Sequence, residues 1–419
     1  MRIALFGDEL LGWQGGRDFF RILFESLKQG CANKDDVTLT TCICRDSLPW
    51  RGMQIGKYLL SNFPYDYGWI AHEINRDSRN KLIERITGER PRIFISGRKE
   101  SDGKCFEAFR GFDVAGPFIS RPDWIDGDAW IGHLYDCQHK RLPHFFSQQE
   151  ISARDDLFVK LLRTAPVVIV NSQDVKADLM TYFAPIRGKI IVLPFAAAAD
   201  PKWFQLDPQQ VQRKYRLPSR YFLCSNQFWQ HKNHGVIFEA LARARARGRT
   251  MAVAFTGEMH DYRNQRYVTD LMVRVQTLGV RDDCHFLGLI PKLEQIAIMR
   301  AALAVIQPTL FEGSRGGLAV ADAIGIGQRV IVSDIPVNRE IEQYVTEFFP
   351  ATDPEALFNV MSRVSEKPYV RRLQEELVAE GVERRRHFGK VLWSAFAMAT
   401  KGLRQSRQPV VSANLSSLY

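Results

Sequence analysis

Short apolar runs alternate with longer stretches of helical pattern along this chain of 419 residues. Each run is continuous rather than alternating, which is typical of strands buried on both faces of a parallel sheet. The runs predicted as strands are residues 2–6, 37–45, 92–96, 112–115, 130–134, 167–170, 189–193, 221–224, 252–256, 284–287, 303–306 and 329–333. Strands that alternate with helices in this way predict an α/β fold built on parallel sheets.

The length of the chain predicts two domains, because a single hydrophobic core rarely grows this large. A linker near residues 197–205 separates two series of strands and helices, so we expect Rossmann-like domains at residues 1–200 and 205–390. In the first, a helix is predicted over residues 18–29, with Phe20, Leu23 and Leu27 on one face.

Two polar stretches fall outside this pattern. Residues 46–90 contain prolines and many charges, and the sequence places them only loosely as loops and short helices. The polar tail, residues 404–419, is expected to be disordered.

Composition narrows the class of partner. Apolar residues make up 45% and charged residues 25% of the chain, as in ordinary soluble globular proteins. The net charge of +10 favours anionic partners such as nucleotide sugars or anionic lipid surfaces. No RRM, zinc-finger or helix-turn-helix motif accompanies this charge, so nucleic acid is not the expected partner. The seven cysteines are scattered without metal-binding spacing, and Cys42 and Cys44 lie in an apolar run that favours packing.

The ends of the chain suggest a location. The N-terminal segment is too polar and too short for a signal peptide, and no apolar run reaches membrane-spanning length. We therefore expect a cytoplasmic, reduced protein. The basic segment 383–386, followed by Trp393 and Phe396, would allow peripheral contact with an anionic membrane at its inner face. A solvated helix face is the simpler interpretation of the same residues.

The stretch from Gln307 to Ile341 carries the clearest chemistry. It begins at the end of a predicted strand and continues into a loop with Glu312, a glycine cluster and a small-residue helix containing Asp322. Ligands of parallel sheets bind at the carboxyl ends of strands, and glycine-rich loops before a helix N-terminus bind anions. Two acids would repel phosphate but accept hydrogen bonds from sugar hydroxyls, so together these features indicate a nucleotide sugar. The alternative is a structural glycine-rich turn with two solvated acids.

This stretch resembles the donor-site signature of retaining GT-B glycosyltransferases, family 4 or group 1. In that family an E-x7-E pattern supplies one acid to the transferred sugar and a second to the ribose hydroxyls. The resemblance assigns these roles to Glu312 and Asp322. The two acids are ten residues apart rather than eight, which places two extra residues in the loop between Ser314 and Gly317.

A second loop, residues 225–234, resembles the G-R-x4-K-[NG] diphosphate loop of the same family. Lys232 and Asn233 match it, whereas Gln227 replaces the arginine and brings no charge. We hypothesise that Arg315 supplies the missing cation. The resemblance further implies diphosphate contacts from the amides of Gly316, Gly317 and Leu318, and backbone contacts to the base near Ile290.

The first domain offers fewer matches. The loop after strand 130–134 resembles a family loop in which a histidine lies near the transferred sugar, and His139 is the candidate, with Asp136 and Lys140 beside it. Gly15 and Gly16 match the first glycine loop, and a tight turn for helix–strand packing explains them equally well. The D-x-D at 126–128 indicates a turn more than a metal site.

Taken together, the resemblance implies a GT-B fold, two Rossmann-like domains facing across a cleft, with helix 391–403 packing back on the first. It implies transfer of a hexose or deoxyhexose, with retention, from a nucleotide-diphosphate sugar to a glycan, lipid-linked or small-molecule acceptor in polysaccharide or glycoconjugate biosynthesis. No cofactor or metal is expected. Two alternatives stay open: a nucleotide-sugar epimerase, and a non-catalytic GT-B-like binding subunit.

Overall fold

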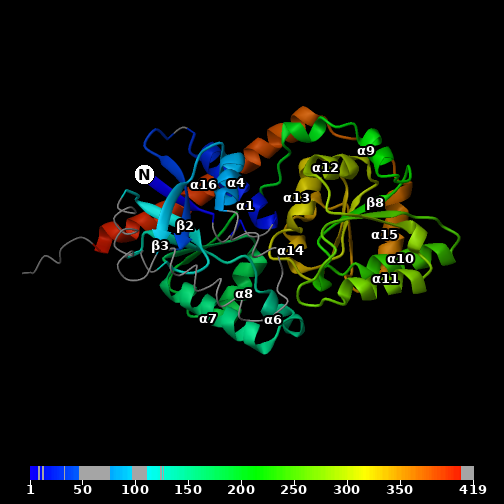
Figure 1. The fold of residues 1–419 in the computed structure, drawn as a ribbon, viewed down its shortest axis with the longest axis horizontal. Coiled ribbons are helices and arrows are strands. Elements are labelled where there is room, and N and C mark those ends of the chain that lie inside the picture. The colour runs from blue at the N-terminus through cyan, green and yellow to red at the C-terminus, as the bar shows by residue number, and fades with distance from the viewer. Residues whose placement is uncertain are drawn as a thin grey trace, which may run out of the picture.

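The computed structural model divides the chain between two parallel sheets, each flanked by helices (Figure 1). It describes residues 1–406 except 8–9, 12–13, 33, 47–75, 97–110, 123–124 and 126. The α/β class and the pairing of two Rossmann-like units agree with the sequence prediction.

The first sheet contains seven described strands in the order β3-β2-β1-β4-β5-β6-β7, all paired in parallel. The strands are β1 (Arg2–Phe6), β2 (Thr38–Asp46), β3 (Arg92–Ser96), β4 (Val114–Phe118), β5 (Trp130–His133), β6 (Val167–Val170) and β7 (Lys189–Val192). The helices are α1 (Gln14–Gly30), α4 (Arg76–Thr87), α6 (Gln138–Arg141), α7 (Gln148–Thr164) and α8 (Gln173–Phe183), with a 3-10 turn η1 (Pro143–Phe145).

Helix α1 begins four residues earlier than the sequence predicted, at Gln14 rather than Asp18. Phe20, Leu23 and Leu27 are buried, as their helical spacing requires. Gly15 and Gly16 therefore lie in the first turn of the helix and not in a preceding loop, which corrects the loop assignment.

The second sheet contains six described strands in the order β10-β9-β8-β11-β12-β13, also parallel. Its strands are β8 (Phe222–Ser225), β9 (Val253–Thr256), β10 (Cys284–Gly288), β11 (Val305–Gln307), β12 (Val330–Ser333) and β13 (Glu347–Phe349). Its helices are α9 (Pro208–Lys214), α10 (Gly235–Ala246), α11 (Tyr267–Thr277), α12 (Lys292–Ala301), α13 (Gly317–Gly325), α14 (Pro336–Arg339) and α15 (Pro354–Glu366). The 3-10 turns are η2 (Pro201–Phe204), η3 (Gln230–Lys232), η4 (Arg281–Asp283) and η5 (Glu342–Tyr344). The sequence did not predict β13, which is short and carries Glu347 among its apolar residues.

The long helix α16 (Gln374–Ser406) starts beside the second sheet and crosses onto the first, where it packs against α1 (Figure 1). Phe388, Leu392 and Phe396 are buried in the core that α1 shares. Gly389 allows the close approach, because a Cβ there would lie 1.7 Å from the carbonyl oxygen of Ser26. The helix includes the first three residues of the expected disordered tail, and residues 407–419 lie outside the described part of the chain.

Most of the residues expected at a membrane surface pack against the protein, whereas Glu383 and Arg386 pair with each other at the surface. Phe396 is fully buried, and the ring of Trp393 packs against the same core under the ammonium of Lys34. Arg384 and Arg385 donate to main-chain carbonyls at residues 197 and 196. Arg384, Arg385, Trp393 and Phe396 are thus engaged within the protein and are not free for a membrane contact. None of the described helices has both the length and the apolar composition that crossing a bilayer requires.

Candidate functional site

Four polar side chains form one chain of hydrogen bonds where β8 and β11 end. The amide of Asn226 donates to Gln307 Oε1 over 2.7 Å, and Gln307 Nε2 donates to Glu312 Oε1 over 2.8 Å. Lys232 Nζ donates to the same Glu312 oxygen over 2.5 Å. The other oxygen, Oε2, has no hydrogen-bond partner among the described residues. The network therefore fixes the carboxylate through one oxygen and leaves the second as an acceptor for a ligand hydroxyl.

The position of Lys232 depends on its neighbour in the loop. Asn233 adopts a left-handed conformation, with φ of 55°, and ends the turn η3. Its side-chain amide donates to the carbonyls of Pro308 and Ala351, over 3.0 and 2.7 Å. Asn233 thus ties the lysine loop to β11, and its amide is committed to the protein. Gln227 makes no side-chain hydrogen bond to any residue that the structure describes.

The glycine segment before α13 turns the backbone toward Glu312. Gly316 and Gly317 have φ angles of 67° and 70°, which glycine adopts at little cost. A Cβ on Gly317 would lie 3.4 Å from the Glu312 carboxylate. The Gly316 amide donates to Asn338 Oδ1, and the Gly317 amide to the Ser314 carbonyl. Of the three amides expected to bind diphosphate, only that of Leu318 lacks a partner within the described ranges.

Asp322 lies further along α13 and pairs with Lys292, at the start of α12. Burial raises the pKa of Asp322, and the Lys292 ammonium partly offsets this effect. Lys292 also lies 5.4 Å from the centre of the Trp203 ring. Ile290, expected near the base, is partly buried against the core of the second domain, whereas its neighbour Leu289 is 77% exposed.

His139 does not line a cleft, which corrects the prediction for this residue. Its side chain is fully buried in α6, with the rings of Phe146, Phe158 and Phe183 around it. Nε2 lies 3.1 Å from Asp155 Oδ1, and Lys140 pairs with the other oxygen of that carboxylate over 2.6 Å. The histidine holds α6 against α7. The sequence pattern placed it after a strand but could not show which way the short helix turns it.

The D-x-D segment also has a structural role where it is described. Asp128 accepts two hydrogen bonds from the Arg187 guanidinium, over 2.9 and 2.7 Å, while Asp126 lies outside the described residues. No group of three or more His, Cys, Asp or Glu side chains in the described part of the chain is arranged to hold a metal ion.

Arg315 reaches the first domain rather than the lysine loop. Its Nε donates to Glu340 Oε2 over 2.9 Å, and its Nη1 donates to the carbonyls of Asn171 and Leu193 over 3.1 and 2.9 Å. The hypothesis that Arg315 replaces the missing cation at Gln227 is therefore not supported by its position. The loop that carries Arg315 therefore contacts the first domain through this guanidinium.

Four residues of this region were not predicted from the sequence: Asn226, Gln307, Lys292 and Glu340. Asn226 directly follows β8, and Gln307 is the last residue of β11. These two strands are neighbours in the sheet. Because the carboxyl ends of neighbouring parallel strands meet, that position was the available signal. Nothing in the local sequence distinguishes Lys292 or Glu340 from other surface charges.

His133, at the end of β5, is a second buried histidine. Its ring stacks on Phe19 of α1 with centroids 5.0 Å apart, and its Nε2 has no hydrogen-bond partner among the described residues. Complete burial lowers the pKa of His133 to about 4, and a hydrogen bond with Asn171 partly opposes this effect. The side chain is therefore neutral in the folded protein near pH 7.

This burial predicts a pH dependence of stability. With a folded pKa below the unfolded value, the unfolded state binds a proton as the pH falls from about 6.5 toward 4 and the folded state does not. The free energy of unfolding of wild type should thus fall about 2 kcal/mol more between pH 7 and pH 5 than that of His133→Asn. Urea unfolding at both pH values measures this. The same substitution at exposed His144 should keep the wild-type slope, and an unchanged slope in His133→Asn would contradict the assignment.

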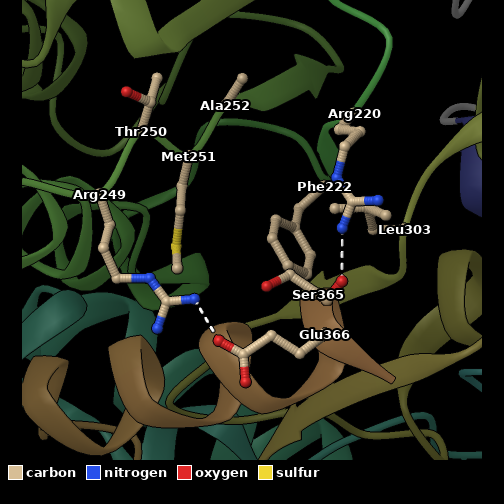
Figure 2. Close-up of a pocket in the computed structure, with 9 residues that line it drawn as sticks. All are labelled: Arg220, Phe222, Arg249, Thr250, Met251, Ala252, Leu303, Ser365 and Glu366. Carbon is tan, nitrogen blue, oxygen red and sulfur yellow. Dashed lines mark hydrogen bonds and ion pairs between the residues drawn. The ribbon is translucent and has the colours of Figure 1, made fainter. Parts of the chain in front are cut away.

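A separate cavity of about 460 Å³ lies at the amino ends of the strands of the second sheet, opposite the end that carries Glu312 (Figure 2). Phe222, Met251 and Leu303 line it at the amino ends of their strands. Its two arginines are engaged, Arg249 with Glu366 over 2.5 Å and Arg220 with the Ser365 carbonyl. The cavity is remote in the sheet from Glu312 and is not part of the candidate site.

Comparisons with known proteins bear on the family and the fold. Residues 208–384 match the family model described as glycosyl transferases group 1. No curated protein sequence matches the chain. Similar solved structures include HepE from Anabaena in complex with UDP and glucose, at 13% identity and a TM-score of 0.56, covering 97% of this chain and 99% of that one. Sucrose-phosphate synthase from Thermosynechococcus elongatus has 15% identity and a TM-score of 0.55, with 97% and 98% covered.

A third similar structure is WaaG, a glycosyltransferase involved in lipopolysaccharide biosynthesis, at 15% identity and a TM-score of 0.52, with 96% of this chain and 99% of that one covered. These identities are too low to transfer a substrate, and they establish the fold. Glu312, Lys232 and Asp322 all lie within the matched residues 208–384. The chain therefore has the GT-B fold, and residues 208–384 in its second domain are similar to the group 1 glycosyltransferases.

Proposed function

We propose that this protein transfers a sugar from a nucleotide-diphosphate sugar to an acceptor hydroxyl. The observation that carries the proposal is the Lys232–Glu312 pair, held at the ends of β8 and β11 beside Gly317 and the open amide of Leu318. A cation and an amide suit a diphosphate, and a fixed carboxylate suits sugar hydroxyls. The matched family and the nucleotide bound in HepE support the same conclusion.

In this proposal the bond between the anomeric carbon and the diphosphate oxygen breaks, and the diphosphate keeps the electron pair. Lys232 has three N–H donors and uses one on Glu312, so the others remain for phosphate oxygens. Stabilising the charge that develops there lowers the barrier. Glu312 Oε2 accepts from a sugar hydroxyl, and Asp322, with Lys292 beside it, contacts the ribose. The acceptor oxygen then bonds to the anomeric carbon as its O–H bond breaks and the proton passes to an oxygen of the departing diphosphate, with retention as the resemblance implies.

Gln227 limits the charge available to the leaving group. With Arg315 engaged at the domain interface, Lys232 is the cation that this loop contributes. We propose that it acts without a metal, so that EDTA leaves the rate unchanged. We further propose a hexose or deoxyhexose donor, a glycan, lipid-linked or small-molecule acceptor, and a cytoplasmic role in polysaccharide or glycoconjugate biosynthesis.

The neutral Gln227 favours a second candidate, because it removes a cation that would stabilise the leaving group. This candidate is a GT-B-like subunit that binds a nucleotide sugar without turning it over. A nucleotide-sugar epimerase is a third reading of the donor site, because it would use Glu312 and Lys232 with no acceptor. The three differ in products: a transferase releases nucleoside diphosphate and lengthens an acceptor, an epimerase returns an altered sugar, and a binding subunit changes nothing.

The test follows directly from this difference. Wild-type protein is incubated with UDP-, GDP-, dTDP- and ADP-sugars, with and without EDTA, in the presence of mixed glycan and lipid acceptors, and the products are identified by mass spectrometry. We expect one nucleotide class to release its diphosphate with a matching gain of mass on an acceptor. A new sugar isomer without diphosphate release, or binding without any product, would contradict the proposal.

A further inference from the structure

The loop that follows Glu312 is built into the interface between the two domains. Arg315, 11% exposed at its side chain, bonds to the carbonyls of Asn171 and Leu193, which follow β6 and β7 of the first sheet. It is paired at the same time with Glu340, which follows α14 in the second domain. One guanidinium thus joins the carboxyl ends of two first-domain strands to the donor domain.

Glu340 continues this contact to helix α8. Its two carboxylate oxygens accept hydrogen bonds from the backbone amides of Gln173 and Asp174, over 3.0 and 2.8 Å. These amides belong to the first turn of α8, where unpaired donors and the helix dipole favour a negative charge. A second-domain carboxylate therefore caps a first-domain helix, and its charge is balanced by Arg315.

The loop itself leaves little space for movement. Ser172 caps α8 by accepting from the Val175 amide, and its hydroxyl donates to the carbonyl of Gly313 over 3.1 Å. A Cβ on Gly313 would lie 2.1 Å from the carbonyl oxygen of Tyr135. Glu312 is adjacent to this contact, so the backbone that carries the donor-site carboxylate is pressed directly against the first domain.

From these contacts we infer that Arg315 and Glu340 are positioning residues that lock the first domain onto the Glu312 loop. The two residues in excess of the family spacing lie in this same loop, which contacts the first domain through Gly313 and Arg315. Breaking the lock leaves a nearly buried charge without its partner and exposes two amides of α8, both of which are unfavourable. In this inference, the contacts of Arg315 and Glu340 with the first domain fix the position of that domain relative to Glu312. They act on the alignment of the acceptor side and not on the binding of the nucleotide.

The experiment compares Arg315→Ala and Glu340→Ala with Arg363→Ala, a control that removes an arginine paired with Glu347 within the second domain. Hydrogen–deuterium exchange measures the exchange rates of the Gln173 and Asp174 amides, which donate to Glu340. We expect exchange there to rise about tenfold or more in both lock variants and to stay at the wild-type rate in the control. Arg263 also crosses the interface, where it bonds to Gln138, and such contacts can hold the domains together when the Arg315–Glu340 contact is lost. Amide exchange at α8 therefore reports the loss of that contact more directly than a measurement of the overall size of the protein.

Two further readouts separate positioning from ligand binding, and they rest on the proposed function. We expect the dissociation constant of the nucleoside diphosphate to stay within about twofold, while kcat falls about tenfold, because domain alignment and not donor affinity is lost. A diphosphate affinity that falls as far as kcat in Arg315→Ala would make this arginine a donor ligand and overturn the inference. Unchanged exchange at both amides in both variants would overturn it as well. The exchange measurement stands even if wild type turns over no nucleotide sugar.

Discussion

Glu312→Gln should slow sugar transfer by about two to three orders of magnitude and leave nucleoside diphosphate affinity nearly unchanged. The glutamine keeps an oxygen for Lys232 and Gln307 but loses the negative charge on the atom that faces the ligand. An oxocarbenium-like ring and its hydroxyls interact with that charge most strongly in the transition state. Steady-state rates with a saturating donor measure kcat, and titration calorimetry with the diphosphate measures affinity.

A matched control is available in the same protein. Glu355 forms a solvent-exposed ion pair with Arg247, away from the candidate site. It can be changed to glutamine without altering the hydrogen bonds around Glu312. Glu355→Gln should keep the wild-type rate. A Glu312→Gln rate within a few-fold of this control would remove Glu312 from the reaction.

Lys232→Met should both abolish transfer and lower the free energy of unfolding by about 3 kcal/mol. Lys232 and Glu312 have side chains only 13% and 10% exposed, so removal of the cation leaves a nearly buried carboxylate unpaired. Most of the loss in stability reflects this uncompensated charge rather than the worth of the ion pair. Urea unfolding at pH 7 measures the effect.

The double variant Lys232→Met, Glu312→Gln separates stability from function. Since both charges are gone, it should recover most of the lost free energy of unfolding while transfer stays absent. Stabilities that simply add, with the double variant weaker than either single one, would show that the two side chains do not interact as the 2.5 Å contact indicates.

The second domain could be predicted in detail because its chemistry is local. Strand, glycine loop and helix are continuous in sequence between residues 303 and 333, and the carboxyl end of a parallel strand is a general ligand position. Glu312 and Lys232 were each placed on such an end from the sequence. That Gln307 holds the Glu312 carboxylate and is itself held by Asn226 was not predicted, because this contact depends on the order of strands in the sheet, which brings β8 beside β11.

The errors arose where tertiary contacts decide what a side chain does. Arg315 bonds to carbonyls 144 and 122 positions away, which no spacing along the sequence reveals. His139 follows a strand as a site residue would, yet the orientation of α6 turns it into an aromatic core. Arg384 and Arg385 look like a basic surface run, but α16 directs them to the linker carbonyls. In each case, burial replaced the solvent or ligand contact that the residue type suggested.

In the proposed function the Lys232–Glu312 site binds the donor, and thermal stabilisation by nucleotides tests this binding most directly. Wild type and Glu312→Gln are melted with UDP, GDP, dTDP or ADP, with and without magnesium, and then with the matching intact nucleotide sugar. A ligand that binds only the folded state must raise the melting temperature. We predict that one nucleotide stabilises both proteins without magnesium, and that only wild type gains further from the intact nucleotide sugar. If none of the four nucleotides raises the melting temperature, the Lys232–Glu312 site is not a donor site and the proposed function is contradicted.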